Sequence, residues 1–109
     1  MQNLISIMLP PLPEPLRKKY RCLSCLTERE DKAIYQGEAT ETGEKVLIKI
    51  ARSEEEVRRL ANEFQILQAI QDTGDPQAAF FPRALDWLPS SGETLVAALV
   101  RSWVEGRSL

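Results

Sequence analysis

The chain has 109 residues, and its 14 Lys and Arg residues against 16 Asp and Glu residues give a formal net charge of −2 at pH 7. Such a length predicts one domain, and a content of 43% hydrophobic and 28% charged residues is typical of globular chains. A weakly acidic chain has no overall attraction to polyanions, so no nucleic-acid partner is expected. The sequence contains no histidine, which excludes Ser-His-Asp triads, Cys-His dyads and His-ligated metal sites.

The first 19 residues have the composition of a linker. The apolar stretch 1–9 is much shorter than the roughly 20 residues that cross a bilayer, and it lacks the basic start and small-residue cleavage site of a signal peptide. Four prolines between positions 10 and 15 predict an extended, polyproline-like segment. We therefore expect an extension over 1–19, a folded domain over 20–109, no membrane insertion and a cytoplasmic location.

Three strands are expected next along the chain. The segments 20–27, 33–40 and 45–51 are rich in apolar and β-branched residues. The charged run 28–32 predicts a solvated turn between the first two, and Gly43 supplies a turn position that tolerates positive φ before the third.

A long helix is expected over 54–71. Ser53 and Glu56 have the spacing of a capping box, and the acidic first turn complements the helix dipole. The helix should end at the turn 72–76. An apolar stripe recurs at three- and four-residue steps, formed by Val57, Leu60, Phe64, Leu67 and either Ile70 or Gln71.

Two further strands complete the expected fold. The segments 83–88 and 94–103 are strand-like and are separated by the turn residues 89–93, which predicts a hairpin. Trp87, close to that turn, is assigned to packing. The order of elements predicts an α+β fold, in which an antiparallel five-stranded sheet packs against one long helix.

Cys22 and Cys25 form a single C-x-x-C motif. A structural zinc site would need two further Cys or His ligands, which the chain does not contain, unless carboxylates served instead. A redox motif belongs at the start of a helix, whereas this one lies in an expected strand, where the two side chains would point to opposite faces. We interpret both as ordinary thiols.

Lys49 and Glu63 are the candidate pair for chemistry. Strand alternation places Lys49 on the partly apolar face of Leu47 and Ala51, where its charge needs a partner. A strand lysine is usually solvated, and so is a helix glutamate. The order of strand and helix nevertheless allows these two to meet across the interface, where an ion pair would hold the ammonium ready for a phosphate.

Three motifs in this order resemble the N-terminal lobe of bacterial-type Ser/Thr protein kinases. Residues 46–49 (VLIK) are similar to the third-strand V-A-I-K motif, and 62–67 (NEFQIL) to the middle of the family's C-helix. Residues 99–109 (LVRSWVEGRSL) are similar to the fifth strand and hinge, with Trp103 at the hinge aromatic position. A packing role for Trp103 is an equal alternative. Pro82 stands where the family carries a proline before the fourth strand.

The resemblance implies a role for each of six positions. Lys49 would hold the α- and β-phosphates of ATP, and Glu63 would orient that lysine. Leu47 would roof the adenine, and Arg101 would stand at the gatekeeper position beside the hinge. The main chain of Ser102 and of Val104 would face the adenine edge.

The sequence also departs from the kinase pattern. The run 25–32, which joins the first two strands, contains no glycine and several acidic residues, so it should cradle phosphates poorly. Leu47 replaces a small alanine, and Arg101 is unusual beside a hinge. The chain contains no H-R-D or D-F-G motif, so these residues alone supply neither the catalytic aspartate nor the magnesium ligands.

The resulting functional prediction is the ATP-binding lobe of a Ser/Thr protein kinase, cut just after the hinge and inactive alone. The full-length parent would use ATP and Mg²⁺ to phosphorylate protein hydroxyls, with a protein substrate and its own C-terminal lobe as partners. No bound cofactor is expected on the 109 residues themselves. Two alternatives remain: a non-catalytic, kinase-like interaction module, and a small-molecule phosphotransferase of similar fold.

Overall fold

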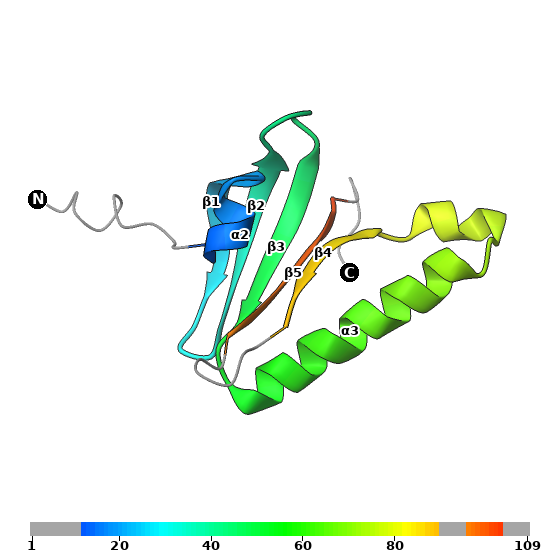
Figure 1. The fold of residues 1–109 in the computed structure, drawn as a ribbon. Helices are drawn as coiled ribbons and strands as arrows, with labels where there is room; N and C mark the ends of the chain where they lie inside the picture. Colours follow the sequence, from blue (N-terminus) through cyan, green and yellow to red (C-terminus); the bar gives the residue numbers. More distant parts are fainter. Residues whose placement is uncertain (1–11, 90–95, 104–109) are drawn as a thin grey trace, which may run out of the picture.

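The computed structural model describes residues 12–89 and 96–103. Five strands and one long helix dominate the fold (Figure 1), and the elements follow one another as α2 (Glu14–Arg17), β1 (Tyr20–Glu28), β2 (Lys32–Ala39), β3 (Lys45–Ala51), α3 (Glu54–Asp72), the 3-10 helix η1 (Pro76–Phe80), β4 (Ala84–Leu88) and β5 (Ala97–Ser102). The strands form one antiparallel sheet in the order β1-β2-β3-β5-β4. The α+β fold expected from the sequence is confirmed.

The predicted bounds agree closely with these elements. β3 spans the predicted residues 45–51, and α3 extends one residue beyond the predicted end. Gly43 has φ +76°, as expected for its turn. β4 and β5 pair antiparallel as the predicted hairpin requires, whereas most of the turn 89–93 lies outside the described residues.

The sheet buries side chains on both faces because the strands alternate apolar residues toward each side. The face that carries α3 is the inner face, and its buried cluster consists of Ala51, Leu60, Leu67, Ala97 and Leu99. The opposite, outer face carries a second cluster. Two of its residues, Val46 and Ile48 at the middle of the sheet, are fully buried.

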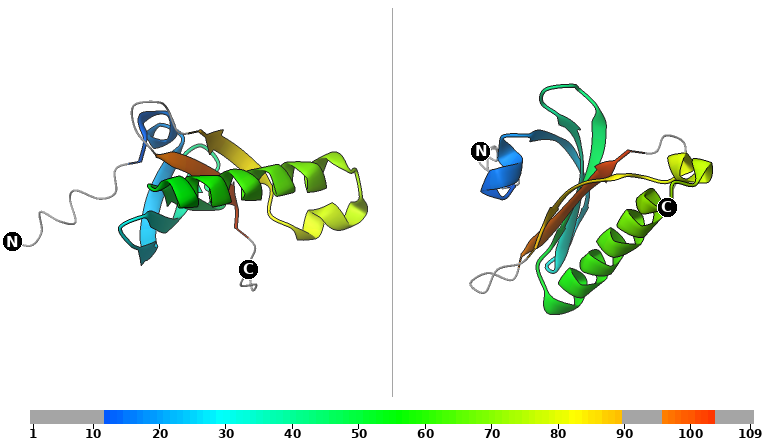
Figure 2. Two further views of the ribbon diagram at one scale, coloured as in Figure 1. Left: turned by 90° about the horizontal axis from the view of Figure 1, so that it is seen from below. Right: turned by 45° about the vertical axis from the view of Figure 1, so that its right-hand side comes forward.

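The N-terminal segment differs from the extended linker that the prolines suggest. From Glu14 the chain forms the one-turn helix α2, which lies on the outer face, away from α3 (Figure 2). Leu12 and Leu16 are buried in the outer-face cluster, with exposures of 4% and 3%. Pro15 is compatible with helix here because it occupies the first turn, where its missing N–H leaves no helical hydrogen bond unmade. The expectation of an extended segment is therefore wrong from Glu14 onward.

The short helix η1 was not expected from the sequence. Its first residue, Pro76, belongs to the stretch 72–76, which was predicted only as the turn that ends α3. Asp75 caps it by accepting a hydrogen bond from the Gln77 N–H at 2.9 Å, and Pro76 occupies its first turn. The segment leads the chain from the end of α3 back to the sheet at β4 (Figure 1).

Candidate functional site

Lys49 and Glu63 meet between β3 and α3. The Lys49 Nζ donates a hydrogen bond to Glu63 Oε1 at 2.8 Å, and each side chain is 24% exposed. The expectation that these two residues lie on facing surfaces of strand and helix is confirmed. Partial burial matters here, because the attraction between the two charges is screened less than it would be in bulk water.

The start of α3 is fixed by the cap that the sequence predicts. Ser53 has extended backbone angles, and its hydroxyl accepts a hydrogen bond from the Glu56 N–H at 3.1 Å. Three glutamates in the first turn complement the helix dipole. Because α3 begins at a defined residue, Glu63 falls on the side of the helix that faces the sheet.

The predicted apolar stripe holds α3 on the sheet. Leu60 and Leu67 are buried, and Val57 and Phe64 pack against the same inner-face cluster. The Phe64 ring stacks on Trp87 of β4, with centroids 5.1 Å apart and planes 8° from parallel. The assignment of Trp87 to packing is therefore confirmed, and the stack lies on the same helix face as Glu63.

Arg101 joins the same carboxylate from β5. Its Nη1 lies 3.2 Å from Glu63 Oε2, and its side chain is 13% exposed. The sequence placed Arg101 near the site but did not predict this ion pair. This contact can be inferred only when the strand pairing is known. β5 lies beside β3 with Arg101 opposite Leu47, so the Arg101 side chain points to the inner face, as Lys49 does. We call Lys49, Glu63 and Arg101 the charge cluster.

A cavity of about 240 Å³ lies beside the charge cluster, between β2, β3 and the first half of α3. Besides Lys49 and Glu63, its charged lining residues are Lys32 at the start of β2 and Glu56 and Arg59 on α3. Lys32 and Arg59 were not predicted as site residues. Three basic and two acidic side chains thus border the cavity, and two of the basic ones are paired within it, Lys49 with Glu63 and Arg59 with Glu56.

The other predicted site residues are distributed around β3 and β5. Leu47 is half-buried on the inner face and pairs with Arg101. Ser102 donates its N–H to the Arg83 carbonyl at 2.9 Å, and its hydroxyl accepts from the Arg83 N–H at 2.8 Å. A main-chain contact from Ser102 to a ligand would therefore have to use its carbonyl oxygen. Val104 lies outside the described residues.

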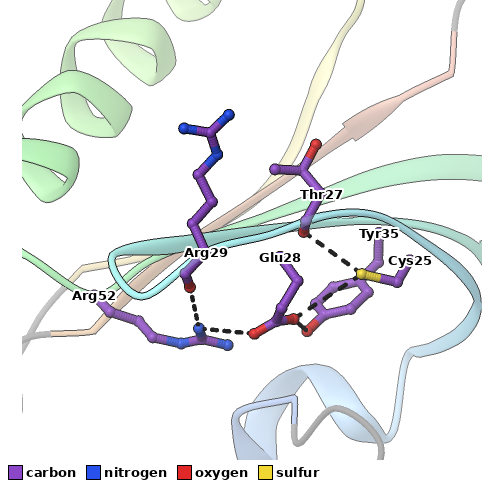
Figure 3. Close-up of polar contacts among 6 residues, drawn as sticks. All are labelled: Cys25, Thr27, Glu28, Arg29, Tyr35 and Arg52. Carbon is purple, nitrogen blue, oxygen red and sulfur yellow. Dashed lines mark hydrogen bonds and ion pairs between the residues drawn. The ribbon is translucent and has the colours of Figure 1, made fainter.

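The glycine-free turn between β1 and β2 is tied to the end of β3 (Figure 3). The Arg52 guanidinium donates through Nη1 to Glu28 Oε2 at 3.2 Å and to the Arg29 carbonyl at 3.1 Å. The Arg52 main-chain N–H donates to the Asp31 carbonyl at 2.8 Å. Tyr35 OH donates to the second carboxylate oxygen of Glu28 at 3.1 Å. We call this set of contacts the turn network.

The turn network leaves the β1–β2 turn poorly suited to cradle phosphates. The Arg29 N–H is used within the turn, where it donates to the Lys32 carbonyl at 2.8 Å. The Glu28 carboxylate accepts from Tyr35, which belongs to the outer-face cluster, so it points away from the face that carries Lys49. The expectation that this turn cradles phosphates poorly stays a prediction.

The two cysteines lie on one face of β1, which corrects the expectation of opposite faces. The register shift between Cys22 and Ser24 places Cys22 opposite Gly37 and Cys25 opposite Tyr35, positions of β2 that share the outer face. This shift adds one residue to the strand between the two cysteines and so reverses the simple alternation. Both thiols are free. Burial is the main cause that raises the pKa of the Cys22 thiol to about 11, and the neighbouring Cys25 contributes a smaller part.

No group of three or more Cys, Asp or Glu side chains within residues 12–89 and 96–103 is arranged to hold a metal ion. Among the helices in this described part of the chain, none has the length and apolar character needed to span a membrane.

The five-stranded sheet, with one long helix following its third strand, defines a protein kinase-like fold. Among solved structures, the chain is similar to the Cydia pomonella granulovirus kinase PK-1, with a TM-score of 0.56 over 95% of this chain at 17% sequence identity. The chain spans 33% of the PK-1 chain. At this identity the likeness concerns the fold. No protein-family model matches the sequence, and no curated protein matches it.

Proposed function

We propose that this chain is the ATP-binding lobe of a protein kinase, which with Mg²⁺ transfers the γ-phosphoryl group of ATP to Ser or Thr hydroxyls of a protein substrate. The observation that carries the proposal is the 2.8 Å contact between Lys49 and Glu63. An ammonium held at a fixed place by a helix carboxylate, beside a cavity bordered by charged side chains of both signs, suits the phosphates of a nucleotide.

The site fits a nucleotide at its lysine end and less well at the β1–β2 turn. Lys49 would contact the phosphates and Glu63 would fix its position, while Leu47 offers apolar surface on the same face of the sheet. The β1–β2 turn contains no glycine, and its Arg29 N–H already donates to the Lys32 carbonyl. We therefore expect the 109-residue chain to bind ATP weakly, with a dissociation constant of roughly 1 mM.

The transfer step requires a base for the substrate hydroxyl and ligands for Mg²⁺. The bound nucleotide would supply the phosphoryl group and the metal would neutralise its charge. Within this chain, Lys49 would hold phosphate oxygens and Glu63 would keep Lys49 in place. A second lobe would provide the remaining groups and face the inner side of the sheet.

Titration of Mg-ATP into the ¹⁵N-labelled chain tests the binding step. We expect saturable shifts of the amides around Lys49 and Leu47, and an affinity about tenfold weaker in Lys49→Met, because a phosphate loses its charged partner. Lys19→Met is the matched control, since it removes another paired lysine, 3.2 Å from Asp86. Equal affinities for Lys49→Met and the unaltered chain would refute the role of Lys49.

A non-catalytic, kinase-like binding module is the second candidate, and the turn network favours it. A turn held by Arg52 through Glu28 and the Arg29 carbonyl has little freedom to close over phosphates. The complete gene product distinguishes the two. A kinase transfers ³²P from ATP to protein hydroxyls and loses most of that activity in Lys49→Met, whereas a module binds its partner without transfer in either form.

A further inference from the structure

Lys32 is a second lysine on the face of the sheet that carries Lys49. β2 and β3 pair with Lys32 opposite Ala51 and Ile34 opposite Lys49. Because directly opposed residues of an antiparallel pair point to the same face, Lys32 shares the inner face with Ala51 and Lys49. Lys32 and Lys49 are diagonal neighbours, and residues in this relation lie roughly 7–8 Å apart, within reach of long side chains. Both line the cavity between β2, β3 and α3.

Lys32 differs from the other charged residues that line this cavity, because its ammonium has no partner. Lys49 is paired with Glu63 at 2.8 Å. Arg59 is paired with Glu56 at 3.5 Å. In the described part of the chain, the Lys32 side chain forms neither an ion pair nor a hydrogen bond. The lining of the cavity therefore keeps one positive charge that an anionic ligand would neutralise.

The β1–β2 turn holds the backbone of Lys32 in place. The Lys32 carbonyl accepts a hydrogen bond from the Arg29 N–H at 2.8 Å, and the preceding carbonyl, of Asp31, accepts from the Arg52 N–H at 2.8 Å. The Arg52 guanidinium also donates to the Arg29 carbonyl. The turn thus uses the Arg29 amide internally, and it presents the Lys32 side chain from a fixed position. Contacts that oppose a main-chain cradle therefore favour a contact made by a side chain.

The order of residues along the inner face assigns Lys32 to the outermost phosphate of a nucleotide. Leu47, Lys49 and Ala51 occupy alternate positions of β3, so successive members lie roughly 6–7 Å apart along the strand. Lys32 lies opposite Ala51, one step beyond Lys49 on the side away from Leu47. A nucleotide whose base rests on Leu47 and whose inner phosphates reach Lys49 would therefore bring its terminal phosphate to Lys32.

We propose that Lys32 is a further phosphate-binding residue, which contacts the terminal phosphate of a nucleoside triphosphate. Lys49 stays paired with Glu63 and contacts the inner phosphates. A lysine at the end of the turn thereby takes the place of the main-chain amides that a glycine-rich turn would supply. The inference rests on the proposed function for the nucleotide, whereas the grip of two lysines on one polyphosphate chain is independent of the base. Lys32 would thus distinguish a triphosphate from a diphosphate.

Titration of ATP and of ADP into the ¹⁵N-labelled chain tests this assignment, without Mg²⁺ so that the phosphate charges face the lysines alone. In Lys32→Met we expect the affinity for ATP to fall about fivefold and that for ADP to stay within about twofold, because only ATP carries the third phosphate. Lys49→Met should weaken the binding of both. Lys32→Arg should retain most of the ATP affinity because it keeps the charge. Lys19→Met, the control at a lysine paired with Asp86, should change neither affinity.

The lysine side-chain signals of the unaltered chain provide a second measurement, which does not depend on a variant that removes the charge. In the chain labelled with ¹³C,¹⁵N-lysine, Lys32→Arg identifies the Cε and Nζ signals of Lys32 by removing them. We expect these signals to shift on addition of ATP or of inorganic tripolyphosphate and to respond much less to ADP. The signals of Lys19 should not move with any of the three.

Inorganic tripolyphosphate separates this inference from the proposed function. Loss of tripolyphosphate affinity in Lys32→Met, with no response of the Leu47 amide to ATP, would support the phosphate role of Lys32 and contradict a nucleotide site. An ATP affinity that falls in Lys49→Met and not in Lys32→Met would overturn the inference and leave the proposed function standing. Equal losses of ATP and ADP affinity in Lys32→Met would overturn the assignment to the terminal phosphate. Binding of neither ATP nor tripolyphosphate to the unaltered chain would contradict both proposals.

Discussion

The charge cluster and the turn network are both built around one glutamate, and they differ in how completely that glutamate is satisfied. In the turn network, Glu28 accepts from Tyr35 on one oxygen and from Arg52 on the other. In the charge cluster, Glu63 Oε2 and Arg101 Nε lack hydrogen-bond partners although both are buried. A satisfied network fixes a backbone segment, whereas an unsatisfied one retains capacity for rearrangement or for a ligand.

The two regions also differ in exposure. Arg101 is 13% exposed, whereas Glu28 is 55% exposed and Arg52 is 31% exposed. The charges of the turn network are therefore screened by water, and they fix the position of the turn more than they add to the free energy of unfolding. Charges of the charge cluster interact more strongly, and changes to them should affect ligand binding more than changes at the turn. This contrast predicts that the two regions can be broken separately.

Phe64→Ala should have the largest effect, because it removes the packing that keeps Glu63 opposite Lys49. Phe64 is half-buried and stacks on Trp87 at 5.1 Å. We expect a loss of about 2–3 kcal/mol in the free energy of unfolding, less than for a fully buried phenylalanine. Urea unfolding measures the loss. Ile66→Ala, which truncates a side chain of the same helix that is 51% exposed, should cost less than about 1 kcal/mol. Equal losses in the two variants would show that the stack does not hold α3.

Arg52→Met should break the turn network and leave the charge cluster intact. The loss of unfolding free energy should be about 1 kcal/mol, since the lost contacts are largely exposed. Exchange of the Arg29 amide, which donates to the Lys32 carbonyl, should rise about tenfold because the turn is released. Arg59→Met, at a 65% exposed arginine that pairs with Glu55, is the control and should not affect that amide. A change in the rate of rotation about the Nε–Cζ bond of Arg101 on Arg52→Met would show that the two regions are coupled.

The fold was predictable because its main signals are local. The alternation in 45–51 and the Ser53 cap fix a strand and a helix start without reference to distant residues. The packing of α2 was not predictable in this way, since burial of Leu12 and Leu16 depends on a sheet surface that forms elsewhere in the chain. The four prolines of this segment instead predicted an extended chain.

The site was predictable in part. The Lys49–Glu63 contact could be anticipated from a strand followed directly by a helix. The Arg101–Glu63 contact requires the pairing of β3 with β5, which are far apart in the sequence, and periodicity carries no information on such a pairing. The orientation of Cys25 depends in the same way on register shifts in β1, because a shift of one residue moves a side chain to the other face.

Tyr35 offers the finest test of the turn network, through alkaline pH. Burial, followed by the hydrogen bond and negative charge of Glu28, raises the pKa of Tyr35 to about 12. The pKa of a tyrosine in the unfolded chain is about 10. The folded state thus holds the proton more tightly, so its contribution to stability is complete below pH 10 and is lost as the pH rises from about 10 to 12. Burial, and after it the hydrogen bond to Asp86, also raises the pKa of Tyr20, which adds to the loss of stability in the unaltered chain.

Tyr35→Phe should therefore cost little at neutral pH, about 0.5–1 kcal/mol for one hydrogen bond. Urea unfolding at pH 7, 10.5 and 11.5 should show the variant losing less stability than the unaltered chain over the alkaline steps, so that the two converge. Tyr20→Phe, which removes the donor to Asp86 on the outer face, gives the corresponding measurement away from the turn. Parallel pH curves for Tyr35→Phe and the unaltered chain would mean that Glu28 does not hold the Tyr35 proton. The turn would then depend on Arg52 alone.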